Sequence, residues 1–133
     1  MRTSAIVAVL AGATLFSTTT AIEAQPRPAA SAPPQCFSAH DWAGWKSVDD
    51  HTMYIRVRGR DIYRVEFAGG CPSLSWPDEH LVTVFRGGDE VCSPLDLDLK
   101  VADGNGIATA CIVSKITPIP YAEAATIPRK LLP

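Results

Sequence analysis

The sequence predicts a mainly β domain in which a small antiparallel sheet of about five to six strands curls into a barrel or a sandwich. Apolar and polar residues alternate along several stretches, glycine-rich turns separate these stretches, and four cysteines supply material for two disulfides. The chain has 133 residues, a length typical of one such domain with terminal segments rather than of two enzyme-sized lobes. Helix is expected only as one or two short turns.

The clearest hairpin signal spans residues 52–67. Apolar and polar residues alternate on both sides of Gly59 with the period of two that is typical of strands. One register sets every apolar residue opposite an apolar partner and leaves a three-residue loop that contains Gly59, whereas a slip by one residue mixes the two faces. The predicted pairs are Val57 with Tyr63, Ile55 with Val65, and Met53 with Phe67.

Further strands are predicted at His80–Arg86, Leu95–Val101 and Ile107–Ile116, the last of which pairs back as a hairpin. Glycine and asparagine residues between them accept the positive φ that tight turns need. Short helical turns are expected near Ser38–Trp45 and Tyr121–Ala125. The side chains predicted to face inward from the strictly alternating second strand are Leu95, Leu97, Leu99 and Val101.

The N-terminal residues 1–24 have the three parts of a signal peptide. A positive start at Arg2 is followed by the uncharged run Ala5–Phe16 and by small residues near the expected cleavage site, after Ala24 or alternatively after Ala21. The run is too short to cross a bilayer, which takes about 20 apolar residues. We therefore expect an exported protein, periplasmic or secreted, with no transmembrane segment once the signal is removed.

The rest of the chain divides into three parts. Residues 25–35, QPRPAASAPPQ, predict an extended, solvated Pro/Ala-rich spacer. A disulfide-bearing β domain follows at residues 36–117, and residues 118–133 form a Pro-rich C-terminal tail. Because no cysteine precedes Cys36, a lipid anchor is not expected and the exported protein is predicted to be soluble.

The four cysteines predict two disulfides in an oxidising compartment. Their spacing contains no CxxC pair, so neither a zinc ribbon nor a thioredoxin-like redox site is indicated. Four cysteines allow three pairings, and the spacing does not decide between them. We favour the nested pattern, in which Cys71–Cys92 lies inside Cys36–Cys111.

Charge and motifs exclude several functions. With 12 Lys and Arg against 14 Asp and Glu, the net charge is −2, which argues against a general nucleic-acid binder. A calcium loop starting at Asp96 fails because its fifth and sixth positions are Lys100 and Val101. Asp78-Glu79-His80 is interpreted as a solvated loop, since adjacent residues of an extended chain point to opposite faces. No catalytic residue, metal ligand or cofactor is predicted.

The outer face of the first hairpin carries the candidate ligand-binding residues. In the predicted register Arg56 faces Arg64, and like charges placed opposite each other cost stability. An anionic ligand would compensate them, because the arginine fork suits carboxylate and phosphate groups. In the alternative interpretation, Asp61 and Glu66 neutralise part of the cluster, Tyr54 covers the rest, and no ligand is needed. The candidate residues are Tyr54, Arg56, Arg58 and Arg64, with Arg60 in the loop.

Aromatic residues flank two of the cysteines. Phe37, Trp42 and Trp45 follow Cys36, and Trp76 follows Cys71. We expect these side chains to pack in the core beside the disulfides. The alternative is a platform of exposed indoles on which a glycan stacks.

These features together resemble the small exported bacterial proteins of domain of unknown function 6491. The resemblance covers about Cys36 to Ile116 and implies an exported, disulfide-bearing β domain without assigned activity, so no catalytic residues are carried over. Family members often have Gly-Asp soon after the third cysteine, whereas Ser93-Pro94 follows Cys92 here. The residues that carry the resemblance are Cys36-Phe37, Trp45–Asp49, Tyr54, Tyr63, Cys71-Pro72-Ser73-Leu74, Cys92 and Cys111-Ile112.

The expected function is that of a non-catalytic binding module of the cell envelope, with an anionic glycan or an envelope protein as its partner. One alternative is an inhibitor of an exported hydrolase that presents residues 69–77 or 87–90 as a rigid loop. A second is a small enzyme without a recognisable motif, whose residues assemble only in the fold.

Overall fold

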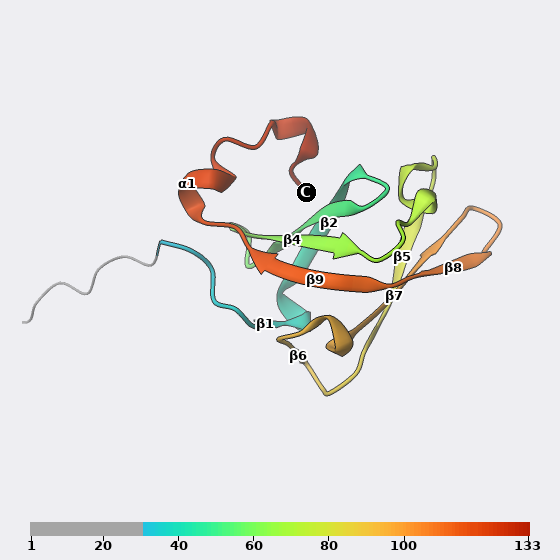
Figure 1. The fold of residues 1–133 in the computed structure, drawn as a ribbon, viewed down its shortest axis with the longest axis horizontal. Coiled ribbons are helices and arrows are strands. Elements are labelled where there is room, and N and C mark those ends of the chain that lie inside the picture. The colour runs from blue at the N-terminus through green and yellow to red at the C-terminus, as the bar shows by residue number, and fades with distance from the viewer. Residues whose placement is uncertain (1–30) are drawn as a thin grey trace, which may run out of the picture.

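The structure is a computed structural model that describes residues 31–133. The predicted signal peptide, residues 1–24, and residues 25–30 of the spacer lie outside the described residues. The strands form three antiparallel sheets (Figure 1). Within each sheet, neighbouring strands follow the order β2-β3-β4-β9, β5-β7-β8 and β1-β6. The strands are β1 (Phe37–Ser38), β2 (Trp42–Asp49), β3 (Thr52–Val57), β4 (Asp61–Phe67), β5 (His80–Phe85), β6 (Glu90–Val91), β7 (Leu97–Ala102), β8 (Ala108–Cys111) and β9 (Val113–Pro118).

The prediction of a mainly β fold with few helical turns and two disulfides is confirmed. Four of the helical elements are short 3-10 turns, and one is a single α-helical turn. No helix of the described residues is long and apolar enough to cross a membrane. The helical elements are η1 (Ala39–Asp41), η2 (Pro72–Ser75), η3 (Pro94–Asp96), α1 (Tyr121–Ala124) and η4 (Arg129–Leu131).

One bent segment joins the two larger sheets. The strand predicted at Ile107–Ile116 is present, but it divides at Ile112 into β8, which pairs with β7, and β9, which pairs with β4. The β4–β9 register shifts between Glu66 and Phe67, and such bulges bend a strand. In Figure 1 β8 and β9 accordingly run on as one long ribbon. Within the described residues β2 and β5 are the outermost strands of the two larger sheets, and each has a strand partner on one side only. Because β2 and β5 do not pair with each other, the sheets do not close into a barrel.

The first hairpin forms in a register two residues away from the predicted one. Ile55 lies opposite Tyr63, and Val57 lies opposite Asp61, so the predicted pairs are wrong although the buried face is right. A shift by two residues preserves the face of every side chain. The turn therefore begins at Arg58, which takes a φ of 50° and is followed by Gly59 at 79°. The backbone N–H of Arg58 donates to the carbonyl of Asp41 at 3.0 Å, which helps hold this tighter turn.

The two larger sheets enclose one hydrophobic core, which is the arrangement of a sandwich. Met53, Ile55 and Val65 of the first sheet are fully buried, as are Leu99 and Val101 of the second. The inward-facing alternation predicted for residues 95–101 is thus confirmed from Leu97 onward, in β7.

Leu95 is the exception, because it is 84% exposed. It lies in η3, before β7 begins at Leu97. The Asp96 carboxylate accepts hydrogen bonds from the backbone N–H groups of Cys92 (3.0 Å) and Ser93 (2.8 Å), which caps this turn. The predicted strand therefore starts two residues too early, and Asp96 is a capping residue rather than the polar face of a strand.

The helix predicted near Ser38–Trp45 is only partly correct. Ala39–Asp41 form a 3-10 turn, and β2 begins directly afterwards at Trp42. Pairing with β3 overrides the local preference, as tertiary contacts often do. The turn predicted at Tyr121–Ala125 is confirmed by α1.

Both ends of the described chain pack against the β domain. Pro33 of the predicted spacer is buried, and the carbonyl of Pro34 accepts a hydrogen bond from the Tyr63 hydroxyl at 2.9 Å. The C-terminal segment, residues 119–133, lies on the outer face of the first hairpin. Its contacts there form a second hydrophobic cluster of Tyr54, Ile62 and Ile119 with Val48, Ala124, Ile127, Leu131 and Leu132.

The disulfides are Cys36–Cys92 and Cys71–Cys111, so the favoured nested pairing is wrong. β1 pairs with β6 and places Phe37 opposite Val91, which brings the neighbouring Cys36 and Cys92 together. Cys71 follows β4, whose end is bonded to the β8–β9 segment through Ala68 N–H and the Ile112 carbonyl at 2.9 Å. That contact brings Cys71 close to Cys111. The two disulfides are therefore interleaved along the sequence, since Cys71 lies between Cys36 and Cys92, and Cys92 lies between Cys71 and Cys111.

Candidate binding site

The four arginines of the first hairpin (Arg56, Arg58, Arg60 and Arg64, here the arginine cluster) do not face one another. Arg56 lies opposite Ile62, and Arg64 lies opposite Tyr54. The predicted opposition of Arg56 and Arg64 is therefore wrong, because the register differs by two residues. The destabilising contact between like charges that motivated a ligand at this face is absent.

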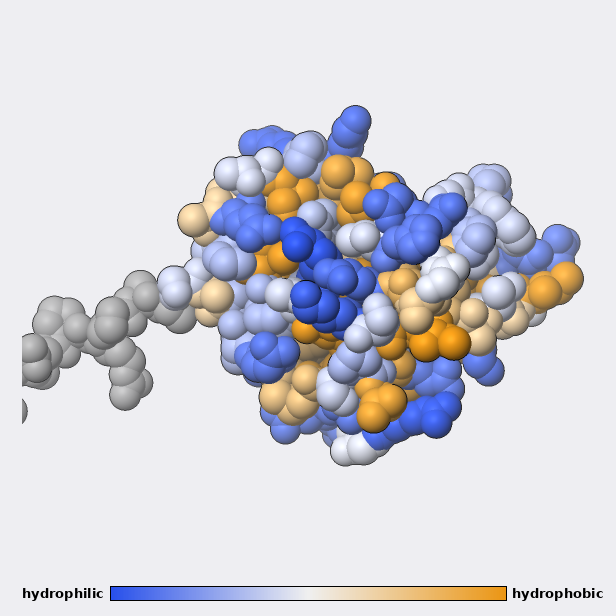
Figure 2. All heavy atoms as spheres, viewed as in Figure 1, coloured by the Kyte–Doolittle hydropathy of each residue, from blue (hydrophilic) through white to orange (hydrophobic). Residues whose placement is uncertain are grey.

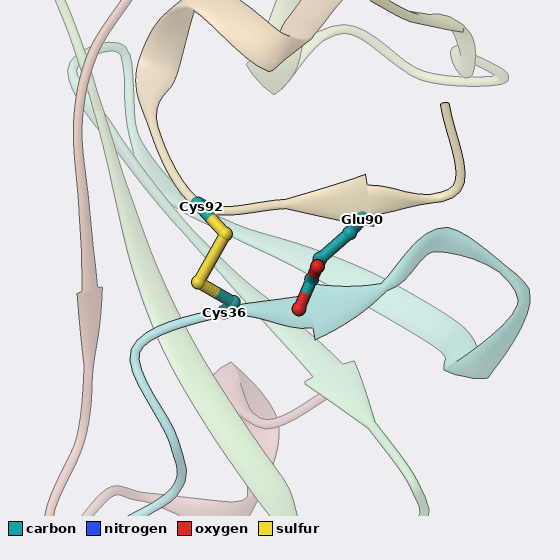
Figure 3. A group of neighbouring side chains, drawn as sticks. All are labelled: Cys36, Glu90 and Cys92. Carbon is teal, nitrogen blue, oxygen red and sulfur yellow. A yellow bond between two sulfur atoms is a disulfide. The ribbon is translucent and has the colours of Figure 1, made fainter. Parts of the chain in front are cut away.

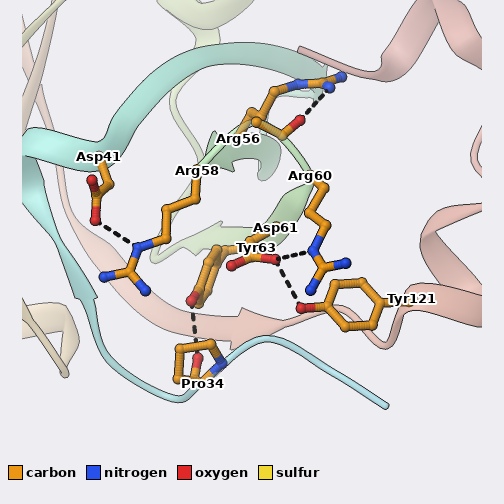
Figure 4. Close-up of polar contacts among 9 residues, drawn as sticks. Pro34, Asp41, Arg56, Arg58, Arg60, Asp61, Tyr63 and Tyr121 are labelled. Atoms are coloured by element: carbon orange, nitrogen blue, oxygen red, sulfur yellow. Dashed lines mark hydrogen bonds and ion pairs between the residues drawn. The ribbon is translucent and has the colours of Figure 1, made fainter. Parts of the chain in front are cut away.

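Acidic side chains of the same chain neutralise much of the arginine cluster (Figure 4). Arg58 Nε lies 2.7 Å from Asp41 Oδ2, and the hydrogen bond and charge of Asp41 raise the pKa of Arg58. Arg60 Nε lies 3.8 Å from Asp61 Oδ1, and its guanidinium stacks over the Tyr121 ring at 4.9 Å from the ring centre. Asp61 thus pairs with an arginine of the cluster as the alternative interpretation expects, whereas Asp41 and not Glu66 is the second acidic partner.

The C-terminal segment supplies the partner of Arg64. Arg64 Nη2 lies 2.8 Å from Glu123 Oε1 of α1, and its guanidinium lies 5.9 Å from the centre of the Tyr54 ring. Contact with Tyr54 and then with Glu123 raises the pKa of Arg64. Tyr54 itself is buried beneath residues of the C-terminal segment. Two of the predicted ligand-binding residues, Tyr54 and Arg64, thus already contact the protein's own chain.

Arg56 differs from the other members of the cluster. Its Nη1 donates to the carbonyl of Gly59 at 2.9 Å (Figure 4), and among residues 31–133 it has no acidic partner within ion-pair distance. In the β2–β3 register Gly44 lies opposite Arg56 and Lys46 lies opposite Tyr54. Lys46 and Arg56 are therefore diagonal neighbours on one face of the sheet.

A buried polar group lies beneath the cluster. Asp61 is only 6% exposed, and its carboxylate accepts a hydrogen bond from the Tyr121 hydroxyl at 2.9 Å, which raises the pKa of Tyr121. Burial, followed by the charge of Asp61, raises the pKa of Tyr63 to about 12. The Tyr63 hydroxyl is bonded to Pro34 (Figure 4). These groups connect the two ends of the described chain to β4.

Cys36, Cys92 and Glu90 form the group that most resembles a metal site (Figure 3). Their potential ligand atoms lie within 4.8 Å of one another. The two sulfur atoms are bonded to each other in a disulfide, so neither is a thiolate that binds metal. A single exposed carboxylate remains, and it does not make a metal centre by itself.

The β2–β5 seam is the gap between the two unpaired outer strands, and it is bridged by side chains instead of backbone hydrogen bonds. The rings of Trp42 and Phe85 meet edge to face, with centres 6.3 Å apart. Trp42, Trp45, Leu81 and Phe85 are partly buried against the main core. Core packing is therefore confirmed for Phe37, whereas Trp42 and Trp45 pack against the core and remain partly exposed. A cavity of about 410 Å³ opens along the seam.

A larger hollow continues from Trp45 toward η2. This tryptophan groove has a volume of about 540 Å³ and is lined by Trp45, Lys46, Ser47, Leu74, Ser75, Trp76, Pro77 and Glu79. Trp76 is 51% exposed, in contrast to the core packing predicted for it.

The turn that carries Trp76 is held in place at both ends. Cys71, the residue before η2, is bonded to Cys111, and Leu74 is fully buried. The Ser75 hydroxyl donates to Asp50 Oδ1 at 3.0 Å. The backbone N–H of Trp76 donates to the Ser73 carbonyl at 3.3 Å. The exposed indole is therefore presented on a fixed support.

Over residues 1–130 the chain matches the model of a family of unknown function, DUF6491. The chain belongs to this family. No curated protein and no solved structure is detectably similar to it.

Several of the residues that carried the resemblance to DUF6491 line the tryptophan groove or form the two disulfides. Cys71-Pro72-Ser73-Leu74 form the start of η2, and Trp45 lines the groove from β2. Asp78, Glu79 and His80 are divided between surfaces: Glu79 lines the tryptophan groove, whereas His80 lines the seam cavity. Trp76 stands between Ser75 and Pro77 in a turn-rich stretch, and this context is the signal that could have indicated its exposure.

Proposed function

We propose that this DUF6491 protein is an exported, non-catalytic binding module whose ligand is an anionic glycan bound in the tryptophan groove. The observation that carries the proposal is the half-exposed indole of Trp76, supported by a disulfide and placed beside Trp45 at the groove. A large aromatic side chain held in solvent by a rigid turn gives up apolar burial, and a ligand that stacks on it recovers that burial.

The lining of the groove supports a sugar rather than a purely apolar ligand. Lys46, Ser47, Ser75 and Glu79 supply hydrogen-bonding groups beside the two indoles. A sugar ring has an apolar C–H face and a rim of hydroxyl groups, so it matches an aromatic surface that is bordered by polar side chains. Binding sites generally combine such apolar walls with a few placed polar groups.

One cation in the lining of the groove, Lys46, supports an acidic sugar, and Arg56 lies next to it outside the lining. Lys46 lines the groove, and Arg56 is its diagonal neighbour across β2 and β3. Arg56 has no acidic partner among the described residues, whereas Arg58 and Arg64 are already ion-paired. We therefore assign the anion contact to Lys46 and Arg56, and not to Arg58 and Arg64.

Export is part of the proposal and is supported by the covalent chemistry. Both pairs of cysteines form disulfides, which persist in oxidising compartments outside the cytosol. The rigid turn at residues 69–77 that a hydrolase inhibitor would present is the same turn that carries Trp76. A hydrolase that the protein inhibits, with inhibition lost in Trp76→Ala, would favour that second candidate function over glycan binding.

The test is calorimetric titration of the oxidised protein with alginate oligosaccharides, which carry a carboxylate on every sugar, and with neutral cello-oligosaccharides. We expect alginate to bind more tightly than the neutral cello-oligosaccharides. Its affinity should fall as the salt concentration rises, because salt screens the charges. Trp76→Ala should weaken binding at least about tenfold, a loss of about 1.4 kcal/mol, without lowering the melting temperature. Leu95→Ala is the matched control, because Leu95 is exposed but lies outside the groove.

Charge reversal separates the two parts of the arginine cluster. Arg56→Glu should weaken alginate binding, whereas Arg58→Glu, which removes the partner of Asp41, should leave it nearly unchanged. Equal affinity of the protein and Trp76→Ala would exclude the groove as the binding site. Equal binding of the acidic and neutral sugars would exclude the anion contact but not the glycan.

A further inference from the structure

The free edge of β5 lacks the features that normally protect an exposed strand from pairing with another chain. Such edges usually carry charged side chains such as lysine, a proline or a bulge, or they are covered by another segment. The other seam strand, β2, has two register shifts and Lys46, and Pro133 lies against it at Gly44. β5 reads HLVTVF and pairs with β7 without a register shift. This contrast with β2 indicates that the outer edge of β5 is suited to pairing with another strand.

The backbone of β5 offers unused hydrogen-bonding groups on this edge. The N–H of Arg86 donates to the Asp96 carbonyl at 2.8 Å and continues the β5–β7 ladder. In an antiparallel pair alternate residues bond to the partner, so Val82 and Val84 bond to β7. Leu81, Thr83 and Phe85 direct their N–H and C=O groups away from β7, and no other backbone partner for these groups occurs in residues 31–133.

The outer face of β5 is also unusually apolar. Val82 and Val84 point away from the core and are 40% and 52% exposed. Other exposed apolar residues belong to the same sheet or to its connections, namely Ile107 and Ile112. On the face seen in Figure 2, hydrophobic side chains likewise reach the surface over the β7–β8 hairpin, at the right of the view. A surface of this kind is typical of an interaction site.

We propose that β5 pairs antiparallel with β5 of a second copy of this chain. With the two-fold axis at Thr83, Val82 lies opposite Val84 of the second copy. On the inner face, Leu81 then lies opposite Phe85 of the second copy. Both pairs join apolar side chains, and the unused N–H and C=O groups of the edge face each other. The contact is isologous, so it closes as a dimer instead of growing into a fibre.

The charges at the ends of β5 favour a second copy as the partner. Asp78 and Glu79 precede the strand, and Arg86 follows it. Antiparallel pairing therefore brings Arg86 of each copy toward the acidic end of the other. Parallel pairing would instead bring together the like-charged ends. The strand is therefore complementary to itself in charge as well as in the pairing of its apolar side chains.

The test is sedimentation velocity of the oxidised protein over a concentration series. We expect the average mass to rise toward twice the monomer mass, and we expect Val84→Lys to stay monomeric because it places a charge opposite Val82 of the second copy. Ile107→Lys is the matched control, since it adds the same charge to an exposed apolar residue in the β7–β8 turn. It should dimerise like the unmodified protein, and the melting temperature of both variants reports that they fold.

A second measurement identifies the edge itself. Amide hydrogen exchange at Leu81, Thr83 and Phe85 should slow as the concentration rises, whereas exchange in β3 should not change. A protein that stays monomeric at the highest soluble concentration overturns the proposal. So does a dimer that Val84→Lys leaves intact, or one in which these three amides exchange at an unchanged rate.

Discussion

Tyr63 joins three parts of the molecule through one side chain. It is fully buried on β4, its ring centre lies 4.8 Å from that of Phe37 on β1, and its hydroxyl donates to the carbonyl of Pro34. Burial disfavours the phenolate, and the charge of Asp61 disfavours it further, which raises the pKa of Tyr63 to about 12. The neutral form of Tyr63 is the form that donates this hydrogen bond to Pro34.

We predict that Tyr63 makes the protein less stable at alkaline pH. Below the ordinary tyrosine pKa of 10.0, Tyr63 keeps its proton in both the folded and the unfolded protein, and its full contribution to the free energy of unfolding is present. Between this value and about 12, the unfolded chain loses the proton first, so the free energy of unfolding falls by an amount on the order of 2 kcal/mol. Tyr63→Phe should remove this part of the pH dependence and cost about 1 kcal/mol at neutral pH through the lost hydrogen bond.

Urea unfolding at a series of pH values measures this effect. The difference in unfolding free energy between the protein and Tyr63→Phe should shrink and reverse sign as the pH rises from neutral toward 12, since other groups titrate alike in both. A constant difference across this range would show that the Tyr63 proton is not held more tightly in the folded protein.

At the scale of elements, the C-terminal segment acts as a cover for the first hairpin. Ile119 is buried against Tyr54 and Ile62, its N–H donates to the Ile62 carbonyl at 2.8 Å, and Glu123 pairs with Arg64. Residues 118–133 were predicted as a Pro-rich tail, and the structure adds that they complete the outer face of the sheet. The hairpin is therefore enclosed by the main core on one side and by this segment on the other.

We predict that Ile119→Ala lowers the free energy of unfolding by about 2–4 kcal/mol, because it leaves a cavity between the hairpin and its cover. Chemical denaturation measures the change. Ile107→Ala is the control, because Ile107 is exposed and its truncation should change stability by less than about 0.5 kcal/mol. A small effect of Ile119→Ala would mean that the C-terminal segment is not held on the sheet in solution.

At the scale of the whole molecule, the crossed disulfides hold the sheets together. Cys36–Cys92 joins the N-terminal segment to β6, and Cys71–Cys111 joins η2 to the second sheet. The bridges span 56 and 40 residues of sequence, for which the chain-entropy model gives about 4 kcal/mol each. A domain of this size has a total stability of about 5–15 kcal/mol, so the two bridges are a large part of it.

We predict that removing either bridge as a pair of serine substitutions lowers the melting temperature, and that removing both unfolds the protein at physiological temperature. Calorimetric melting of Cys36→Ser/Cys92→Ser and of Cys71→Ser/Cys111→Ser measures the first effect. Peptide mapping without reduction is the direct control and should recover Cys36 linked to Cys92 and Cys71 linked to Cys111. A Cys71–Cys92 peptide would contradict the crossed arrangement.

Local pattern was sufficient to predict β3, β4, β5, most of β7 and the β8–β9 segment, together with the class of the fold, but it missed β1, β2 and β6. The alternation over residues 52–67 and from Leu97 onward depends only on which side chains leave water, and neighbouring residues determine that. The same locality explains the errors. A two-residue shift keeps every face, so the alternation could not distinguish pairing of Ile55 with Val65 from its actual pairing with Tyr63.

The sequence by itself determined a mainly β, two-disulfide member of DUF6491, together with the arginines and tryptophans that are its candidate binding residues. Only the tertiary structure decided how the cysteines pair, which arginines are already neutralised, and that Trp76 faces solvent while Trp45 packs inward. These outcomes depend on contacts between segments far apart in sequence, such as β1 with β6, Arg64 with Glu123, and β2 beside η2. Such contacts are set by the packing of the whole chain, and no local spacing of residues encodes them.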